Sequence, residues 1–268
     1  MNTNGNATGS KPLVDSLPPL LIAIVEDKGG VGKSTIADAL HAGLTQGGLR
    51  VGMIDIDGSN SVGVMQHEDA IFGDTSDAGW QAKISIAMRA MATGKGMHVL
   101  ILDSGARDEY HVRAELEDFN EKMSAFGGRI LVVRPLTTSR FTHANAAKFA
   151  QDTAETNIAV VTMEVQAQGR TEKNFTRWRA SDACRKAKEA GAEMTHIESF
   201  GIEFIDDAVA CRLSVGDIAR ANFDKKTAHP KAREVFGDEG VVWAQDIVKK
   251  HMRRWLPVFH AALAQRGR

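Results

Sequence analysis

Several features of membrane and secreted proteins are missing from this sequence. Its 268 residues contain no run of about eighteen apolar residues, so no transmembrane helix is expected. The segment from Met1 to Pro19 has neither a basic start nor a long apolar core, and it does not resemble a secretory signal. The two cysteines, Cys184 and Cys211, are too far apart for a metal-type spacing and suit a reducing compartment. We therefore expect a cytoplasmic protein.

An excess of charge of either sign is also missing. The 33 Lys and Arg residues nearly balance the 34 Asp and Glu residues, for a formal net charge of −1. Any contact with nucleic acid must therefore come from a local basic patch. An apolar fraction of 43% with 25% charged residues is typical of a soluble globular protein. The length predicts one sizeable domain over residues 20–268, after a disordered tail over residues 1–19 that is rich in Asn, Thr, Gly, Ser and Pro.

A glycine-rich run at residues 26–35 has the most informative surroundings. It follows an apolar segment, residues 20–25, that predicts a buried strand. It precedes residues 36–44, whose apolar side chains recur at helical spacing. Strand, glycine-rich turn and helix is the context that a phosphate-binding loop requires, and it favours such a loop over an ordinary turn between strand and helix.

The residue types of this run suit phosphate chemistry. Glycines let the backbone bend and bring its N–H groups against phosphate oxygens, and the helix that follows adds the positive end of its dipole. Lys33 supplies a cation for the β and γ phosphates, and Ser34 offers a hydroxyl to Mg²⁺. With ATP and Mg²⁺ as the expected cofactors, the predicted binding residues are Lys28, Gly29, Gly30, Val31, Gly32, Lys33, Ser34 and Thr35.

Two further apolar segments end in carboxylates. Residues 50–57 predict a second strand, with Asp55 and Asp57 on one side of it by alternation. Residues 97–103 predict a strand that ends in Asp103, in the form of a Walker B element, whose carboxylate holds Mg²⁺ through its water shell. Since ligands bind at the carboxyl ends of parallel strands, these side chains should face the phosphates. Of Asp55 and Asp57, one would hold Mg²⁺ through water and the other would orient the attacking water, although capping of the strand end is an alternative.

The run from Lys28 to Thr35 resembles the deviant Walker A motif of the ParA/MinD family of P-loop ATPases, and residues 54–60 resemble that family's second motif. The resemblance extends from about Leu20 to Ala219, and its first third is specific. It implies an α/β fold with a doubly wound, mostly parallel sheet flanked by helices, as in P-loop NTPases. It also implies that Lys28 reaches across a homodimer interface to the partner's nucleotide, and that Asp57 is the residue most tied to hydrolysis. A local positive charge that steers ATP is the alternative role for Lys28.

The chain departs from the family pattern at three places. Gly58 replaces a usual proline, and the turn at residues 103–106, Asp-Ser-Gly-Ala, is closer to plasmid-encoded relatives involved in stability or conjugation. Many P-loop relatives carry an Asn near the end of the strand expected at residues 157–165, where it reads the adenine. This sequence has residues 162–164, Thr-Met-Glu, at that place, so the resemblance does not assign adenine recognition.

Two basic stretches remain. Residues 170–188, the most basic, read either as a solvated amphipathic helix or as a patch that contacts DNA phosphates nonspecifically. The second is a last helix at about residues 239–265, for which packing on the sheet is a simpler reading than binding to a membrane. Pro257 should kink or break this helix.

A final strand is expected over residues 197–205.

The resemblance implies slow, Mg²⁺-dependent ATP hydrolysis in an ATP-bridged homodimer. Such a dimer is a switch that positions DNA or other cargo, as in plasmid partition, with a small DNA-binding adaptor that stimulates hydrolysis. An accessory ATPase of conjugation or plasmid stability is one alternative, and a nucleotide-dependent binding module with negligible turnover is another. A metabolic P-loop enzyme fits less well, because a reductase needs cluster-ligating cysteines and a synthetase would not need Lys28.

Overall fold

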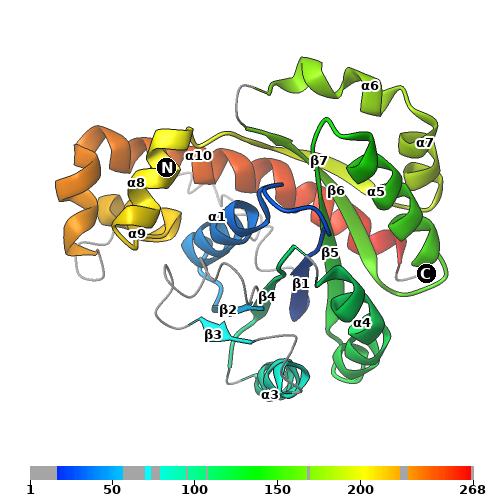
Figure 1. Cartoon of the computed structure of the whole chain (residues 1–268). Coiled ribbons are helices and arrows are strands. Elements are labelled where there is room, and N and C mark those ends of the chain that lie inside the picture. Colours follow the sequence, from blue (N-terminus) through cyan, green and yellow to red (C-terminus); the bar gives the residue numbers. More distant parts are fainter. Residues whose placement is uncertain are drawn as a thin grey trace, which may run out of the picture.

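The structure is a computed structural model that describes residues 17–56, 70–73, 79–94, 96–106, 108–167, 170–223 and 229–266. Within these residues, seven strands form a single sheet (Figure 1): β1 (Leu20–Ile24), β2 (Val51–Asp55), β3 (Ile71–Phe72), β4 (Val99–Asp103), β5 (Arg129–Leu136), β6 (Ala159–Gln166) and β7 (Glu193–Glu198). The helices over the same residues are α1 (Lys33–Gln46), α3 (Trp80–Ala92), α4 (Glu109–Ser124), α5 (Arg140–Asp152), η2 (Glu172–Phe175), α6 (Thr176–Arg179), α7 (Asp182–Glu189), α8 (Ile202–Ala210), α9 (Val215–Phe223) and α10 (Pro230–Gln265).

The strands run in the order β3-β2-β4-β1-β5-β6-β7, and every described pair is parallel. The predicted α/β fold with a doubly wound sheet is therefore confirmed. β1 lies at the centre of the sheet, and all five of its residues are buried. A run of apolar residues buried on both faces is what a central parallel strand requires.

Alternate residues of β1 enter two different cores. Ile22 and Ile24 pack in a cluster with residues of α1 and α10, whereas Leu21 and Ala23 pack with residues of α3, α4 and α5. In Figure 1 the red part of α10 runs behind the strands of the sheet. The sequence periodicity of each helix and the alternation of the central strand therefore specify the same two layers.

A third, smaller core joins α8, α9 and the first part of α10. Its buried members include Ala208, Ile218 and Val241. The carboxylate of Asp38 on α1 ties this part to the rest, because its Oδ2 accepts a hydrogen bond of 2.7 Å from the Val215 N–H at the start of α9. In Figure 1 this part lies at the left of the view, beyond α1.

Three expectations about the chain's course need correction. The strand expected at residues 197–205 is misplaced: β7 ends at Glu198, and Gly201, with φ of 80°, precedes α8. The basic stretch is not one helix, because Ser181 caps α7 with its side chain and divides the stretch into η2, α6 and α7. Pro257 does not break α10, in which Gly237 (φ 63°, ψ −179°) is the non-helical residue. Burial of Trp255 and Phe259 against the sheet holds the helix together on both sides of that proline.

The start of the described chain is also earlier than expected. The disordered tail was expected to extend to Pro19, but Leu17 is buried, with 4% of its surface exposed. The carbonyl of Pro19 accepts a hydrogen bond of 2.9 Å from the Arg129 N–H. Leu17 therefore packs against the rest of the described chain, and residues 1–16 lie outside the described residues. Among the described helices, none is both long and apolar enough to cross a bilayer.

Candidate functional site

The glycine-rich loop joins β1 to α1 at the carboxyl edge of the sheet. Gly30 has φ of 66° and Gly32 has φ of 90°, a backbone region that residues with a Cβ avoid. A Cβ on Gly32 would also come within 3.2 Å of Val165 Cγ1. Directly after Gly32, α1 begins at Lys33, so the unpaired N–H groups of its first turn face the loop. The backbone thus has the form that the sequence predicts for a phosphate cradle.

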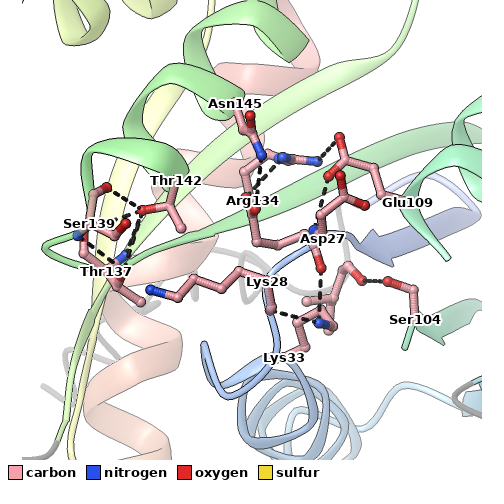
Figure 2. A network of polar contacts seen from close by, with 12 residues as sticks. Asp27, Lys28, Lys33, Ser104, Glu109, Arg134, Thr137, Ser139, Thr142 and Asn145 are labelled. Carbon is pink, nitrogen blue, oxygen red and sulfur yellow. Dashed lines mark hydrogen bonds and ion pairs between the residues drawn. The ribbon is translucent and has the colours of Figure 1, made fainter. Parts of the chain in front are cut away.

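The two lysines of the loop have different surroundings. Lys33 is buried, and its Nζ donates hydrogen bonds to the carbonyl oxygens of Glu26 (2.9 Å) and Lys28 (3.3 Å). Lys28 is exposed, and Figure 2 shows its side chain extended away from Lys33. One cation is thus held inside the loop, while the other is presented at the surface.

The predicted carboxylates of β2 and β4 come together. In the sheet register, Asp103 lies next to Ile24 of β1 on one side and to Asp55 of β2 on the other. Register neighbours in parallel strands point to the same face, and Ile24 packs on the side of α1. Asp55 and Asp103 are both buried, with 0% and 1% of their surfaces exposed. The two carboxylates therefore share the face on which α1 and the loop lie.

This set of oxygen donors fits a magnesium ion. Carboxylates and a hydroxyl are ligands that Mg²⁺ accepts, directly or through water. Asp55 and Asp103 supply the carboxylates, and Ser34 supplies the hydroxyl from the first turn of α1. The predicted third carboxylate, Asp57, lies outside the described residues.

A buried ionic network beside the loop was not found from the sequence. Arg134 of β5 is fully buried, and its Nη2 donates a hydrogen bond of 2.9 Å to Glu26 Oε2. Its Nη1 forms an ion pair of 2.8 Å with Glu109 Oε1 at the start of α4. Asn145 Nδ2 donates to Glu26 Oε1 at 3.3 Å, and Figure 2 shows the whole network. The available signal was an arginine within an otherwise apolar strand.

The network has electrostatic consequences for the loop. Burial raises the pKa of Glu26, an effect that the Arg134 guanidinium opposes. Burial, followed by the nearby Glu109 carboxylate, also raises the pKa of Asp27. The Asp27 N–H donates a hydrogen bond of 3.1 Å to Glu109 Oε2. The first residues of the loop are therefore attached to β5 and α4 as well as to β1.

A cavity of about 240 Å³ lies beside the loop. Loop residues Gly30, Gly32 and Thr35 form one wall. The other wall comes from the ends of β6 and β7 and from the start of α8, through Val165, Ala167, Arg170, Ile197, Glu198, Ser199, Phe200, Gly201 and Ile205. Most of these residues are apolar, so the cavity suits a flat, weakly polar group. Lys250, followed by Arg254, lowers the pKa of Glu198 to about 2, so this carboxylate is charged at neutral pH.

Several cations of the basic stretch at residues 170–188 form ion pairs with nearby carboxylates. Arg179 forms ion pairs with Glu164 and Glu172, and Arg185 and Lys186 both pair with Asp182. Arg170 lines the cavity beside the loop. The cations of this stretch that form no ion pair with another described residue are Lys173, Arg177 and Lys188.

A second basic surface follows α10. Asp246, Lys249, Lys250, Arg253 and Arg254 surround a shallow hollow of about 570 Å³. Lys250 and Arg254 pair with Glu198 at 2.6 and 2.9 Å, whereas Lys249 and Arg253 are exposed and form no ion pair with a described residue.

Comparisons with known proteins bear on the family. A family model described as an AAA domain matches residues 20–71, which include β1, the glycine-rich loop, α1 and β2. The match covers 52 of the 268 residues, and it includes Lys28, Lys33 and Asp55. Among curated protein sequences, no match was found.

Three solved structures show distant likeness. A putative plasmid partition protein from Borrelia burgdorferi B31, bound to AMPPNP, is 13% identical with a TM-score of 0.47, over 88% of this chain and 99% of that chain. A ParA family ATPase from Chlorobium tepidum TLS is 14% identical with a TM-score of 0.44, over 84% and 98%. The 54 kDa signal recognition particle protein of Aeropyrum pernix K1, in complex with GDP, is 15% identical with a TM-score of 0.45, over 78% and 53%, so this chain spans about half of its length.

Likeness at this level carries no argument about function. The sheet order and the backbone of the glycine-rich loop agree with the α/β fold that the ParA/MinD resemblance implies, and the family model matches the segment that contains this loop.

Proposed function

We propose that this chain is a Mg²⁺-dependent ATPase of the ParA/MinD type whose ATP-bound form is a homodimer. The observation that carries the proposal is the contrast between the two lysines of the loop. Lys33 is held inside by the Glu26 and Lys28 carbonyls, whereas Lys28 is exposed beside it. A P-loop needs one lysine for its own phosphates, so an exposed second lysine is available to the nucleotide of another subunit.

The residues of the site have distinct roles in this proposal. The loop backbone and the first turn of α1 bind the phosphates, and Lys33 offsets their negative charge. Ser34, Asp55 and Asp103 would hold Mg²⁺, which supplies further positive charge to the phosphate oxygens when bound. We assign Asp57 to the orientation of the attacking water, which makes it the residue on which turnover depends.

The cavity beside the loop is our candidate for the adenine. It borders the loop at Gly30, Gly32 and Thr35, and its other wall is largely apolar. Stacking against such a wall requires no asparagine, which is consistent with the Thr-Met-Glu sequence at residues 162–164. Arg170, Glu198 and Ser199, which line the wall opposite the loop, are our candidates for polar contacts with the base.

Dimerisation is tested by measuring molar mass in solution with a non-hydrolysable ATP analogue and Mg²⁺. We expect a dimer with the analogue and a monomer without it. Lys28→Ala should bind nucleotide as wild type does but remain monomeric, whereas Lys33→Ala should bind nucleotide much more weakly. Lys148→Ala, an exposed lysine on α5, is the matched control and should behave as wild type. A nucleotide-loaded wild type that stays monomeric, or a Lys28→Ala protein that still dimerises, would overturn the proposal.

Turnover separates an ATPase from a binding module. We expect Asp57→Ala to bind ATP normally and to hydrolyse it at least about a hundredfold more slowly than wild type, since water positioning is lost. If wild type itself shows no turnover above buffer, the binding-module alternative is correct. The proposal includes an adaptor protein that stimulates hydrolysis. The cargo decides whether the protein acts in partition or in conjugation.

We also propose nonspecific DNA contact through exposed cations. The stretch at residues 170–188 retains Lys173, Arg177 and Lys188 for this purpose, because its other described cations face the cavity or pair with acids. The α10 surface offers Lys249 and Arg253 as a second candidate.

Retention of duplex DNA, measured with ATP at low and high salt, compares the two surfaces. Phosphate contacts should give a steep loss of retention as salt rises. Lys173→Glu with Arg177→Glu tests the first surface, and Lys249→Glu with Arg253→Glu tests the second. If both double variants retain DNA as well as wild type does, the proposal of DNA contact is wrong.

A further inference from the structure

One peptide unit in the loop makes two contacts that belong together. The unit between Glu26 and Asp27 contains the Glu26 carbonyl and the Asp27 N–H. The carbonyl accepts a hydrogen bond of 2.9 Å from Lys33 Nζ, and the N–H donates one of 3.1 Å to Glu109 Oε2. A trans peptide unit is planar, with its N–H and C=O pointing in opposite directions. Fixing the N–H therefore fixes the direction in which the carbonyl faces Lys33.

Glu109 is itself held in place. It lies in the first turn of α4, is 7% exposed, and forms an ion pair of 2.8 Å with Arg134 Nη1. The other arm of Arg134 reaches Glu26 Oε2 at 2.9 Å. A guanidinium is a rigid planar fork, so the two carboxylates keep a fixed separation. Figure 2 shows this chain of contacts from Arg134 through Glu109 to the backbone of the loop.

We propose that Glu109 and Arg134 are positioning residues for the phosphate-binding lysine: Glu109 fixes the Glu26–Asp27 peptide plane, and Arg134 fixes Glu109. The inference rests on the proposed function, since it concerns how Lys33 is set for a triphosphate. A lysine ammonium has three N–H donors. The carbonyls of Glu26 and Lys28 direct two of them, and so they set the direction of Nζ before nucleotide binds.

Stability alone is a weak reason for this arrangement. Buried ion pairs replaced by apolar side chains of similar volume often leave a protein as stable as before, or more so. Arg134 and Glu26 are both 0% exposed, so both charges are fully desolvated. The orientation that two carboxylates and one arginine impose on the start of the phosphate-binding loop explains why they lie there.

The test is a double-mutant cycle on nucleotide affinity. Glu109→Ala removes the acceptor for the Asp27 N–H, and we expect about a tenfold or larger rise in the Kd of a fluorescent ATP analogue with Mg²⁺. Glu109→Gln keeps an acceptor oxygen but loses the charge that pairs with Arg134, so it should have a smaller effect. Glu117→Gln, at an exposed position on the same helix, is the control and should leave the Kd unchanged.

Coupling to Lys33 separates positioning from general support of the fold. If Glu109 acts through Lys33, both Glu109 variants should have little further effect in a Lys33→Ala background, measured at high nucleotide concentration. The Glu109→Gln arm, which conserves shape, remains informative if Glu109→Ala folds poorly. Additive effects of Glu109→Gln and Lys33→Ala, or an unchanged Kd in the single Glu109 variants, would overturn the inference while leaving the proposed ATPase intact. Absence of nucleotide binding by wild type would overturn both.

Discussion

Replacing Arg134 with methionine should destabilise the protein much more than removing a surface arginine does. The substitution keeps a long apolar side chain but leaves Glu26, which is 0% exposed, and Glu109, which is 7% exposed, without their shared cation. Breaking a buried ion pair by removing one partner costs about 3–5 kcal/mol of unfolding free energy. We expect a loss in that range at neutral pH.

Arg113 provides a closely matched control. It forms an ion pair with Asp152 at a position where both side chains are 36% exposed. Its guanidinium lies 5.7 Å from the centre of the Phe149 ring, and that of Arg134 lies 4.8 Å from the same ring. Arg113→Met therefore loses a similar cation–π contact but only a partly exposed ion pair, which is worth about 0–1 kcal/mol. The difference between the two variants reports on the buried charges.

The same substitution should also make stability depend on pH in a defined direction. Burial already raises the pKa of Glu26 above 4.5, and Arg134 opposes that rise. A carboxyl whose pKa is raised in the folded state contributes stability that is present below its unfolded pKa and is lost as pH rises through the folded pKa. Without Arg134 the folded pKa rises further, so the loss should be largest at about pH 8 and smallest near pH 4.5.

Urea unfolding at about pH 5 and pH 8 measures both effects, followed by the fluorescence of the buried Trp80, Trp178 and Trp255. Wild type, Arg134→Met and Arg113→Met are compared at each pH. The electrostatic reasoning is refuted if Arg134→Met is no less stable than Arg113→Met at pH 8. It is also refuted if the difference between them grows toward pH 5.

Three further predictions concern other parts of the fold. Gly32→Ala should lower the free energy of unfolding by about 1–2 kcal/mol and weaken nucleotide binding, because φ of Gly32 is 90°. Adding Val165→Ala, which removes the nearest side chain, should restore neither stability nor binding. Full restoration would show that the contact with Val165, and not the backbone conformation, was responsible. Pro257→Ala should raise the free energy of unfolding by about 1–3 kcal/mol, since α10 continues through this exposed proline. A melting temperature lower than that of wild type would contradict this prediction. Burial lowers the pKa of His251 to about 4, so about 3 kcal/mol of the free energy of unfolding should be lost as pH falls from 6.5 through 4. His251→Gln should flatten the curve of stability against pH over this range. An unchanged slope would show that His251 is not the group responsible.

Local pattern in the sequence predicted the backbone form of the candidate site, whereas the roles of its residues remain predictions. A glycine-rich turn between an apolar strand and a helix constrains its own backbone, so the position of Lys33 followed from spacing alone. The alternation of buried strands placed Asp55 and Asp103 at carboxyl ends, and the sheet register then brought them side by side. Asp57, which completes the predicted set, is outside the described residues and remains a prediction.

The network around Arg134 could not be predicted in the same way. An arginine in an apolar strand indicates a buried partner, but the pairs Glu26–Arg134 and Glu109–Arg134 join three separate segments, and spacing cannot select among the many carboxylates available. Tertiary packing likewise decided the course of α10, where Trp255 and Phe259 outweigh the local preference of Pro257. In both cases the determining contacts are distant in the sequence.

The register that aligns Ile24, Asp103 and Asp55 has an evolutionary consequence. In a strand with alternating side chains, deleting a single residue from β4 ahead of Asp103 would turn its carboxylate toward the helices of the other layer. Apolar residues within β4 could be exchanged for one another with little harm, because both layers accept Val, Leu and Ile. Selection on this strand should therefore tolerate substitutions in its interior while rejecting insertions and deletions of odd length.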